Sequence, residues 1–460
     1  MEPNMDSSAY IDGYIERARK AQKEFEKFSQ EQVDRVVMTI AKTVYDNADY
    51  LAEIAVEETG MGVVADKAAK NRAKARLIWN NLKGKKSRGI IERDEKTGIT
   101  KIAKPMGVVA AITPVTNPIV TPMGNAMFAL KGGNAIIITP HHRAVKCSGK
   151  TVELINAELD KLGAPKHLIQ IIDQQSRENT KQLISSADVV IATGGMGMVK
   201  AAYSSGRPAL GVGAGNVQCI VDEDADIKTA APQIIEGRAF DNGILCTSEQ
   251  SIILPESRYE EMLEEFERNG AFVVKKPSEK EAVRNAIFSG EAMSRHAIGQ
   301  SVQTIARLAG LSVPGGTRVI IVEADGAGKE DLIAKEKMCP VLAAYKYKTF
   351  EEAVEIARAN LEHEGKGHSV SIHSNNKEHI EYVGRELPVS RFLVNQVCAV
   401  AAGGSFFNGL APTNTLGCGS WGNNSISENL DYKHLINISR IAYYMKDNPV
   451  PSDEELWCLE

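Results

Sequence analysis

The stretch GVVAAITPVTNPIVTPMGNAMFALKGGNAIIIT (residues 107–139) decides the fold. Both of its ends are short apolar runs, at 107–113 and 134–139, which are typical of buried strands. The residues between them read as a helix that ends at Gly132. Strands joined by helices build a parallel sheet that is covered on both faces. Such a sheet binds ligands at the carboxyl ends of its strands, so we expect a binding site there.

The same alternation extends in both directions along the chain. Residues 8–29 have the spacing of an amphipathic helix, and more helix is expected through about residue 83. After 139 the expected elements are a helix at 143–162 and strands at 167–172 and 188–193. A second α/β unit starts near residue 230, with strand candidates at 250–254, 317–322, 341–347, 369–373 and 391–395. With 460 residues, we expect an α/β protein of two or three subdomains.

Two segments fall outside this alternation. Residues 88–107 alternate isoleucine with charge around EKTG, a pattern that predicts a β-hairpin with an exposed face. Such a hairpin often pairs with another sheet. The tail, 428–460, is polar with scattered aromatic residues and lacks a core of its own, so we expect it to pack on a partner or to cross between subunits.

Composition excludes several classes of function. The net charge is −5, from 54 basic and 59 acidic residues, which argues against a dedicated nucleic-acid binder. No apolar run approaches the roughly 18 residues of a membrane span, and MEPNMDSSAY lacks the regions of a signal peptide. We therefore expect a cytoplasmic protein without a membrane partner. The seven cysteines form no CxxC and the nine histidines no HxxxH, so neither a disulfide framework nor a metal site is expected.

Two stretches offer groups for catalysis. DNGILCTSEQS (241–251) contains Cys246, which is either a small buried hydrophobe or a nucleophile. ITPVTNP (112–118) ends a strand, and its Asn117 is either an oxyanion donor or a helix cap. Local sequence leaves both choices open.

Other stretches carry weaker signals. IATGGMG (191–197) follows an apolar strand, and its Gly194 and Gly195 would let a backbone approach a cofactor or would simply make a tight turn. KEKMCPVL (335–342) offers Glu336 before a strand. HEGKGHSVSIHS (363–374) offers His368, although a lone histidine is more often structural than catalytic.

Taken in order, these stretches resemble the aldehyde dehydrogenase superfamily over nearly the whole chain. The resemblance is greatest to the CoA-acylating branch, especially the aldehyde dehydrogenase half of bifunctional aldehyde–alcohol dehydrogenases. It is carried by FDNGILCTSEQSIIL, ITPVTNPI, TPHHRA, GVGAGN, EKMCPVLA, GHSVSIHS and GCGSWGNNSISEN. It implies a Rossmann-like cofactor domain (1–87 and 105–225), an α/β catalytic domain (226–427) and a small β oligomerisation element (88–104 and 428–460). The expected assembly is a homodimer or a dimer of dimers.

The resemblance also implies a role for individual residues. Cys246 would attack the aldehyde, and Asn117 with the Cys246 backbone N–H would hold the oxyanion. Glu336 would bind the nicotinamide ribose. His368 is the candidate for proton transfer involving the CoA thiol or Cys246. The full set implied for binding NAD or NADP is Thr113, Pro114, Thr139, His141, Arg143, Gly194, Gly195, Gly211 and Glu336.

The absence of one catalytic glutamate indicates which molecule accepts the acyl group. A thiolate adds to the aldehyde, hydride leaves for the nicotinamide, and an acyl-enzyme thioester remains. Hydrolytic members of the superfamily carry a glutamate that activates water at the head of an ELGGK-type motif. The matching stretch here is GVGAGN, with Gly211 in the place of that glutamate. A missing general base slows water attack by about 10²–10⁴-fold, which favours coenzyme A as the acceptor.

The motif that binds the adenine ribose differs from that of many hydrolytic members, which bears on the choice between NAD and NADP. Many hydrolytic members have lysine before proline at the adenine ribose, whereas this chain has Thr139 followed by His141, His142 and Arg143. Arg143 or a histidine could pair with a 2′-phosphate, so NADP is possible beside NAD.

Arg238 precedes Cys246 by eight residues and could lie at the substrate mouth with Thr116. The substrate could then be an anionic aldehyde, such as sulfoacetaldehyde or succinate semialdehyde, as well as acetaldehyde. Alternatively, Arg238 is an exposed helix residue.

Two other functions compete with this hypothesis. An acyl-phosphate reductase would use the same fold and cysteine with phosphate instead of coenzyme A. A non-catalytic paralogue would be a scaffold whose Cys246 is no more reactive than the other thiols.

Overall fold

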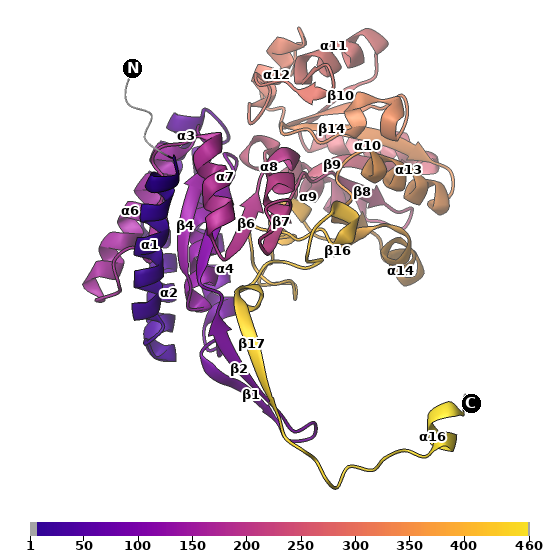
Figure 1. Ribbon diagram of the computed structural model, residues 1–460. Coiled ribbons are helices and arrows are strands. Elements are labelled where there is room, and N and C mark those ends of the chain that lie inside the picture. The colour runs from indigo at the N-terminus through magenta and orange to yellow at the C-terminus, as the bar shows by residue number, and fades with distance from the viewer. Residues whose placement is uncertain (1–6, 459–460) are drawn as a thin grey trace.

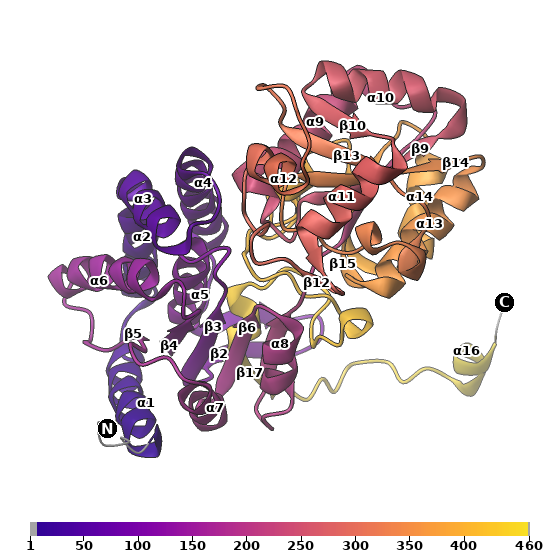
Figure 2. The ribbon, with the colours of Figure 1, turned by 90° about the horizontal axis from the view of Figure 1, so that it is seen from above.

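The computed structural model describes residues 7–458, so residues 1–6, most of the stretch examined for a signal peptide, and 459–460 lie outside it. Two α/β bodies lie side by side (Figures 1 and 2). A narrow antiparallel sheet projects from the first body. Beyond it, the last segment of the chain runs away from both bodies to a short helix.

The first body contains a five-stranded parallel sheet of order β5-β4-β3-β6-β7. Its strands are β3 (Val108–Thr113), β4 (Ala135–Pro140), β5 (Ile169–Ile171), β6 (Val189–Thr193) and β7 (Ala209–Val212). Its helices are α1 (Ser7–Phe25), α2 (Gln30–Asp46), α3 (Ala48–Thr59), α4 (Val64–Leu82), α5 (Val120–Lys131), α6 (Val145–Lys161), α7 (Arg177–Ser186) and α8 (Met196–Tyr203). Helices α1 and α7 cover one face of the sheet, and α5 and α6 cover the other (Figure 2).

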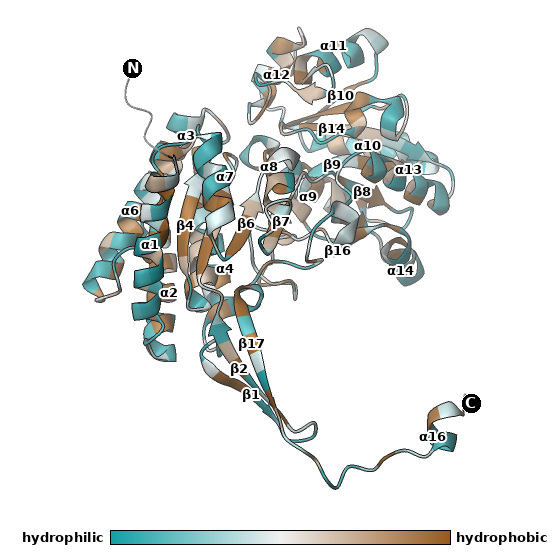
Figure 3. Cartoon of the chain, in the orientation of Figure 1, coloured by the Kyte–Doolittle hydropathy of each residue, from teal (hydrophilic) through white to brown (hydrophobic). Residues whose placement is uncertain are grey.

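Residues 107–139 fold as expected, into a strand, a helix and a second strand. Strands β3 and β4 pair in parallel, and every residue of both strands is buried. The helix between them ends with Gly132 as its C-cap. In Figure 3 the central strands are hydrophobic while the outer helices are largely hydrophilic, as a sheet covered on both faces requires.

The second body contains a seven-stranded sheet of order β10-β13-β14-β9-β8-β15-β16, with all of its pairs parallel. Its strands are β8 (Val217–Val221), β9 (Glu249–Pro255), β10 (Ala271–Val274), β13 (Val319–Glu323), β14 (Val341–Tyr347), β15 (Gly367–His373) and β16 (Val389–Val394). The two short strands β11 (Phe288–Ser289) and β12 (Ala292–Met293) pair separately. The helices are α9 (Ile227–Ala239), α10 (Tyr259–Arg268), α11 (Pro277–Ile287), α12 (Val302–Leu308), α13 (Phe350–His363), α14 (Lys377–Glu386) and α15 (Cys398–Ala401).

The predicted boundary between the two domains, at 225/226, falls too late. Strand β8 pairs with β9 and β15 of the second sheet, so the chain changes sheets between residues 212 and 217. The glycine-dense stretch 211–216 makes this passage. A five-residue apolar strand has no periodicity that assigns it to one sheet or the other, which is why its sequence did not place it.

The narrow sheet is the predicted hairpin completed by part of the tail. Strand β1 (Gly89–Asp94) pairs antiparallel with β2 (Ile99–Pro105), and β17 (Ile436–Ala442) pairs with the other edge of β2. The hairpin therefore finds its third strand in its own chain. Beyond β17 the chain carries exposed aromatic side chains as far as α16 (Asp453–Trp457). In the described part of the chain, no helix is both long and apolar enough to cross a membrane.

Candidate active site

Cys246 and Asn117, 129 positions apart in the sequence, line one cavity of about 160 Å³. Its walls come from both bodies. Helix α4 contributes Lys70, Lys74 and Leu77 together with two alanines. Besides Asn117, the other lining residues are Phe240 and members of the segments 245–247, 399–403 and 413–416. Most of the other lining side chains are apolar, so polar groups in this cavity meet little competition from water.

Cys246 sits on a loop that is held firmly. It follows α9 and a short 3₁₀ turn, and it precedes β9. The Thr247 hydroxyl donates to the Ala399 carbonyl at 2.6 Å. Cys246 is partly exposed, whereas Cys147, Cys219, Cys339, Cys398 and Cys418 are buried.

The Cys246 thiol is neutral at rest. Burial raises its pKa to about 12, with the nearby Glu336 carboxyl and Cys418 adding to the rise and Arg391 opposing it. A thiol reacts as its thiolate. Attack on an aldehyde therefore has to be accompanied by loss of the thiol proton.

Glu336 lies in the loop before β14, beside the cysteine loop. Its Oε1 accepts a hydrogen bond from Gly215 N at 3.3 Å. Burial, with the neighbouring Glu364, raises the pKa of Glu336 to about 8. This carboxyl therefore titrates at mildly alkaline pH, and its ionisation changes the charge near Cys246.

Asn117 lies in the connection between β3 and α5. Helix α5 has Ile119 as its N-cap, without a side-chain capping bond, so the Asn117 side chain does not cap it. Instead, Asn117 Oδ1 accepts a hydrogen bond from Lys70 Nζ at 2.8 Å. Because an ammonium can only donate, this bond fixes the amide and leaves Nδ2 available to donate elsewhere.

The predicted cofactor residues gather at the carboxyl edge of the first sheet. Thr113 ends β3, Thr139 is the next-to-last residue of β4, and Gly194 and Gly195 follow β6, on adjacent parallel strands. The space around both glycines is open, since a Cβ built on either would meet nothing within 4 Å. Pro114 and Thr116 lie half-buried just beyond β3.

This edge fits a dinucleotide. The glycines leave room for a flat ligand at the N-terminus of α8. The Thr113 hydroxyl is buried and has no hydrogen-bond partner within the described residues. A polar ligand bound in the open space beside the two glycines could form the hydrogen bond that the Thr113 hydroxyl lacks.

The basic residues after β4 differ in character. Burial, with His142 and Arg143 nearby, lowers the pKa of His141 to about 4, so His141 is neutral at physiological pH. Arg143 is exposed, and its Nη2 donates to the Thr59 carbonyl at 2.7 Å. Arg143 is therefore the positive charge of the TPHHRA motif.

The predicted placement of Arg238 is wrong. Arg238 is fully buried and donates to the backbone carbonyls of Glu249, Lys337 and Cys339. It is absent from the lining of the Cys246 cavity, and it is not an exposed helix residue either. Its guanidinium joins the start of β9 to the loop that follows Glu336. Spacing along the sequence placed Arg238 near Cys246 but could not show which way its side chain points.

His368 is buried on β15 and does not line the Cys246 cavity. Its Nδ1 lies 3.1 Å from Ser369 Oγ. Burial, with Arg391 nearby, lowers its pKa to about 3. It therefore stays neutral, and a role in proton transfer remains a sequence-based prediction.

Gly211 lies on β7, facing α8. A Cβ built on Gly211 would stand 2.9 Å from both the Tyr203 ring and Val199. The Tyr203 hydroxyl accepts from Gly211 N at 2.8 Å and from Ser425 N at 3.0 Å. The space beside Gly211 is therefore filled by a tyrosine that ties the 416–430 loop to β7.

Lysines of α4 are the main site residues that the sequence analysis missed. Lys67, Lys70 and Lys74 follow one another at three- and four-residue spacing, which places them on one face of the helix. That face also carries buried alanines. Lysine recurring on a face that is otherwise apolar was the signal available in the sequence.

Comparison with known proteins agrees with this geometry. The profile of the aldehyde dehydrogenase family matches residues 2–434. Succinate-semialdehyde dehydrogenase (acetylating) of Clostridium kluyveri is 57% identical over 98% of this chain and 100% of its own. Sulfoacetaldehyde dehydrogenase of an Acholeplasma species is 42% identical over 96% of this chain and 93% of its own.

Solved structures share the fold. An acetylating aldehyde dehydrogenase from Geobacillus thermoglucosidasius superposes with a TM-score of 0.93 at 39% identity, covering 97% of this chain and 98% of its own. A propionaldehyde dehydrogenase from Rhodopseudomonas palustris, with bound CoA and an acylated cysteine, has a TM-score of 0.84 at 27% identity over 94% and 97%. An engineered glycolyl-CoA reductase with bound NADP+ has a TM-score of 0.84 at 28% identity over 94% and 96%. The chain therefore belongs to the aldehyde dehydrogenase family and is an NAD(P)-dependent aldehyde dehydrogenase of its CoA-acylating branch.

Proposed function

We propose that the substrate is a short aldehyde with a carboxylate at its far end, of which succinate semialdehyde is the best example. One observation carries this proposal: among the described residues that line the Cys246 cavity, two are lysines and none is acidic. The names of the Clostridium kluyveri and Acholeplasma relatives both specify an anionic aldehyde, and that of the Clostridium kluyveri relative specifies one with a carboxylate.

Lys74 is the residue suited to bind the carboxylate. Its Nζ donates to the Gly403 carbonyl at 2.7 Å and to the Thr413 carbonyl at 3.2 Å, and within the described chain it has no carboxylate partner. Burial, with Lys70 nearby, lowers the pKa of Lys74 to about 8. Lys70, in contrast, already pairs with Asp241. A half-buried ammonium without a counter-ion favours an anionic ligand.

The chemistry then follows from the positions of the side chains. The Cys246 sulfur adds to the aldehyde carbon, and the carbonyl oxygen gains the charge that Asn117 Nδ2 and the Cys246 N–H are proposed to stabilise. A nicotinamide cofactor, when bound, would supply the acceptor for the hydride of this adduct. The product on Cys246 is a thioester. The sulfur of CoA loses its proton and displaces the Cys246 sulfur, which regains a proton, so that acyl-CoA and the free Cys246 thiol are formed. Among the described residues that line the Cys246 cavity, none is a carboxylate that could activate water.

The cofactor residues are proposed in the same way. Thr113, Pro114 and Thr139 would line the dinucleotide, Gly194 and Gly195 would lie under it, and Glu336 would hold the nicotinamide ribose. Arg143 would meet a 2′-phosphate, and NADP would then be an acceptable cofactor beside NAD. Comparing kcat/KM for both cofactors in the wild type and in Arg143→Ala tests this assignment.

An aldehyde panel tests the substrate proposal. Succinate semialdehyde, sulfoacetaldehyde, butanal and acetaldehyde would each be assayed by nicotinamide absorbance, with and without CoA. We expect kcat/KM to be at least about tenfold higher for succinate semialdehyde than for butanal, which has the same chain length without the charge. A preference for butanal would overturn the anionic assignment. Turnover with phosphate in place of CoA would instead favour acyl-phosphate chemistry.

The narrow sheet and the tail are proposed to build a homo-oligomer, a dimer or a dimer of dimers. Tyr444 is 93% exposed and Trp457 is 78% exposed, on a segment that runs away from both bodies (Figure 1). Large aromatic side chains are enriched in interfaces. Light scattering of the full chain and of a chain ending after residue 442 tests this by giving the number of subunits in each oligomer. The same number of subunits in both would contradict a role for the tail.

A further inference from the structure

Two adjacent residues in front of the catalytic cysteine have a backbone conformation that is unusual outside glycine. Asp241 has φ 52° and ψ 37°, and Asn242 has φ 54° and ψ 33°. A left-handed conformation of this kind is unfavourable for a residue with a side chain, and Asp and Asn tolerate it best. Surrounding contacts must therefore hold this turn in place.

The Asp241 carboxylate makes those contacts with the start of α4, in the other body. Its Oδ1 accepts from Val63 N at 2.9 Å. Its Oδ2 accepts from Lys67 Nζ at 2.9 Å and from Lys70 Nζ at 2.8 Å. The Asp241 backbone N–H donates back to the Asp66 carboxylate at 2.8 Å. Four hydrogen bonds thus join the cysteine loop to this helix.

The cluster is buried and tightly packed. Asp241 is 0% exposed, and burial alone would raise its pKa, but Lys70 and Lys67 hold that pKa below its usual value. Burial, with the neighbouring Lys70, lowers the pKa of Lys67 to about 8. A Cβ on Gly62 would overlap the Asp241 carboxylate, so no larger group fits. One carboxylate therefore balances two ammonium groups.

The cluster continues to the reacting centre. Lys70, which binds Asp241, also donates to Asn117 Oδ1 at 2.8 Å, and Asn117 lines the cavity with Cys246. The amide that is to donate to the oxyanion is thus tied, through Lys70 and Asp241, to the loop that carries the nucleophile.

We propose that Asp241 is a positioning residue that aligns the two oxyanion donors, Asn117 and the Cys246 N–H, by holding Lys70 between them. The two donors come from different bodies, and an error of about 1 Å in such a constellation can cost about 10²-fold in rate. This inference rests on the proposed role of Asn117.

A double-mutant cycle tests this inference. Asp241→Asn keeps the shape of the side chain but removes the carboxylate that binds Lys67 and Lys70. Lys70 then loses the ion pair that fixes the position of its ammonium group. The readout is the single-turnover rate of nicotinamide reduction with excess enzyme, without CoA and with butanal, so that anion binding does not contribute. We expect Asp241→Asn to lower this rate by about 10–100-fold in the wild type but by less than about threefold in Asn117→Ala. Equal losses in both backgrounds would overturn the proposal.

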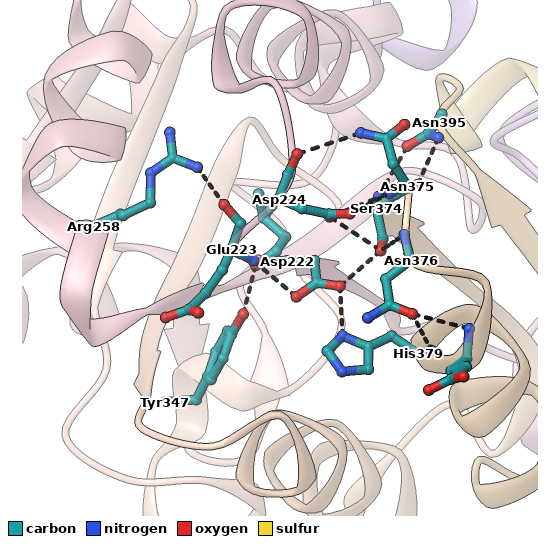
Figure 4. A network of polar contacts seen from close by, with 12 residues as sticks. Asp222, Glu223, Asp224, Arg258, Tyr347, Ser374, Asn375, Asn376, His379 and Asn395 are labelled. Carbon is teal, nitrogen blue, oxygen red and sulfur yellow. Dashed lines mark hydrogen bonds and ion pairs between the residues drawn. The ribbon is translucent and has the colours of Figure 1, made fainter.

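A control and a second variant keep the outcome unambiguous. Asp222 is another buried aspartate, which accepts from the Ser374 hydroxyl at 2.7 Å and contacts His379 Nδ1 at 2.7 Å at the far ends of β8 and β15 (Figure 4). Asp222→Asn should lower the melting temperature while leaving the single-turnover rate within about twofold. If Asp241→Asn does not fold, Lys70→Met breaks the same link and enters the same cycle. An Asn117→Ala variant with full activity would refute the oxyanion role itself, a result distinct from failure of the Asp241 coupling.

Discussion

Gly215 lies directly against the backbone of Cys246, so that a methyl group built on Gly215 would overlap the Cys246 carbonyl oxygen. The same glycine donates its N–H to Glu336. The absence of a side chain at one position of GVGAGN therefore lets the cysteine loop and the Glu336 loop come together.

Gly215→Ala should lower kcat/KM for the aldehyde by about 10²-fold, because the cysteine loop must move to admit the methyl group. Steady-state kinetics with CoA present checks this. The control is Gly149→Ala in α6, where an added methyl meets nothing within 4 Å. That variant should keep full activity and gain roughly 0.5–1 kcal/mol in its free energy of unfolding. A fully active Gly215→Ala would show that this contact does not position Cys246.

Gly211→Glu should not convert the enzyme into a hydrolase. The new side chain would collide with Tyr203 and Val199 and point toward α8. We expect a lower melting temperature and no rise in turnover without CoA. Assays with and without CoA measure this directly. Rapid CoA-independent turnover would mean that the glutamate reaches the thioester after all.

The pH dependence of Cys246 alkylation should show the effect of Glu336 ionisation on the pKa of the Cys246 thiol. Below its pKa a thiol gains about tenfold in thiolate for each pH unit. Glu336 has its pKa raised to about 8, by burial and then by Glu364, and its ionisation raises the thiol pKa further. The wild-type alkylation rate should therefore climb less than tenfold per unit above pH 8. Glu336→Gln should keep the full slope and react faster than wild type at pH 9. Parallel profiles for the two proteins would contradict the charge coupling.

Lys74→Met should raise the KM for succinate semialdehyde by about 10–100-fold, because a partly buried charge-assisted hydrogen bond contributes roughly 1.5–3 kcal/mol. Butanal should be affected little. Since Lys74 loses its proton as the pH rises through about 8, the wild-type preference for the anionic aldehyde should also fall above that pH.

The control is Lys161→Met, at an exposed residue on α6, which should leave both KM values unchanged. A Lys74→Met enzyme that keeps its preference would place the carboxylate elsewhere in the cavity.

Sequence patterns predicted what depends on local periodicity and motif order. The apolar runs at 107–113 and 134–139 predicted two strands of a parallel sheet, and the helix between them ends at the expected Gly132. The family and its CoA-acylating branch followed from seven motifs in order, although no single motif was specific.

What escaped prediction depends on three-dimensional packing. Arg238 and Asp241 both lie close to Cys246 in sequence, yet one binds backbone carbonyls and the other binds lysines of a distant helix. Lys74 enters the cavity only because α4 packs beside a loop more than 300 residues later in the chain. Pairing across such separations leaves no local pattern to find.

The central claim is that Cys246 carries the acyl group and that coenzyme A removes it. Mass spectrometry of the wild-type enzyme, incubated with succinate semialdehyde and NAD(P)+ without CoA, tests this most directly. We predict a mass increase of one acyl group on the peptide that contains Cys246, lost rapidly when CoA is added and absent in Cys246→Ser. An adduct on another cysteine, or one lost equally fast with and without CoA, would contradict the account.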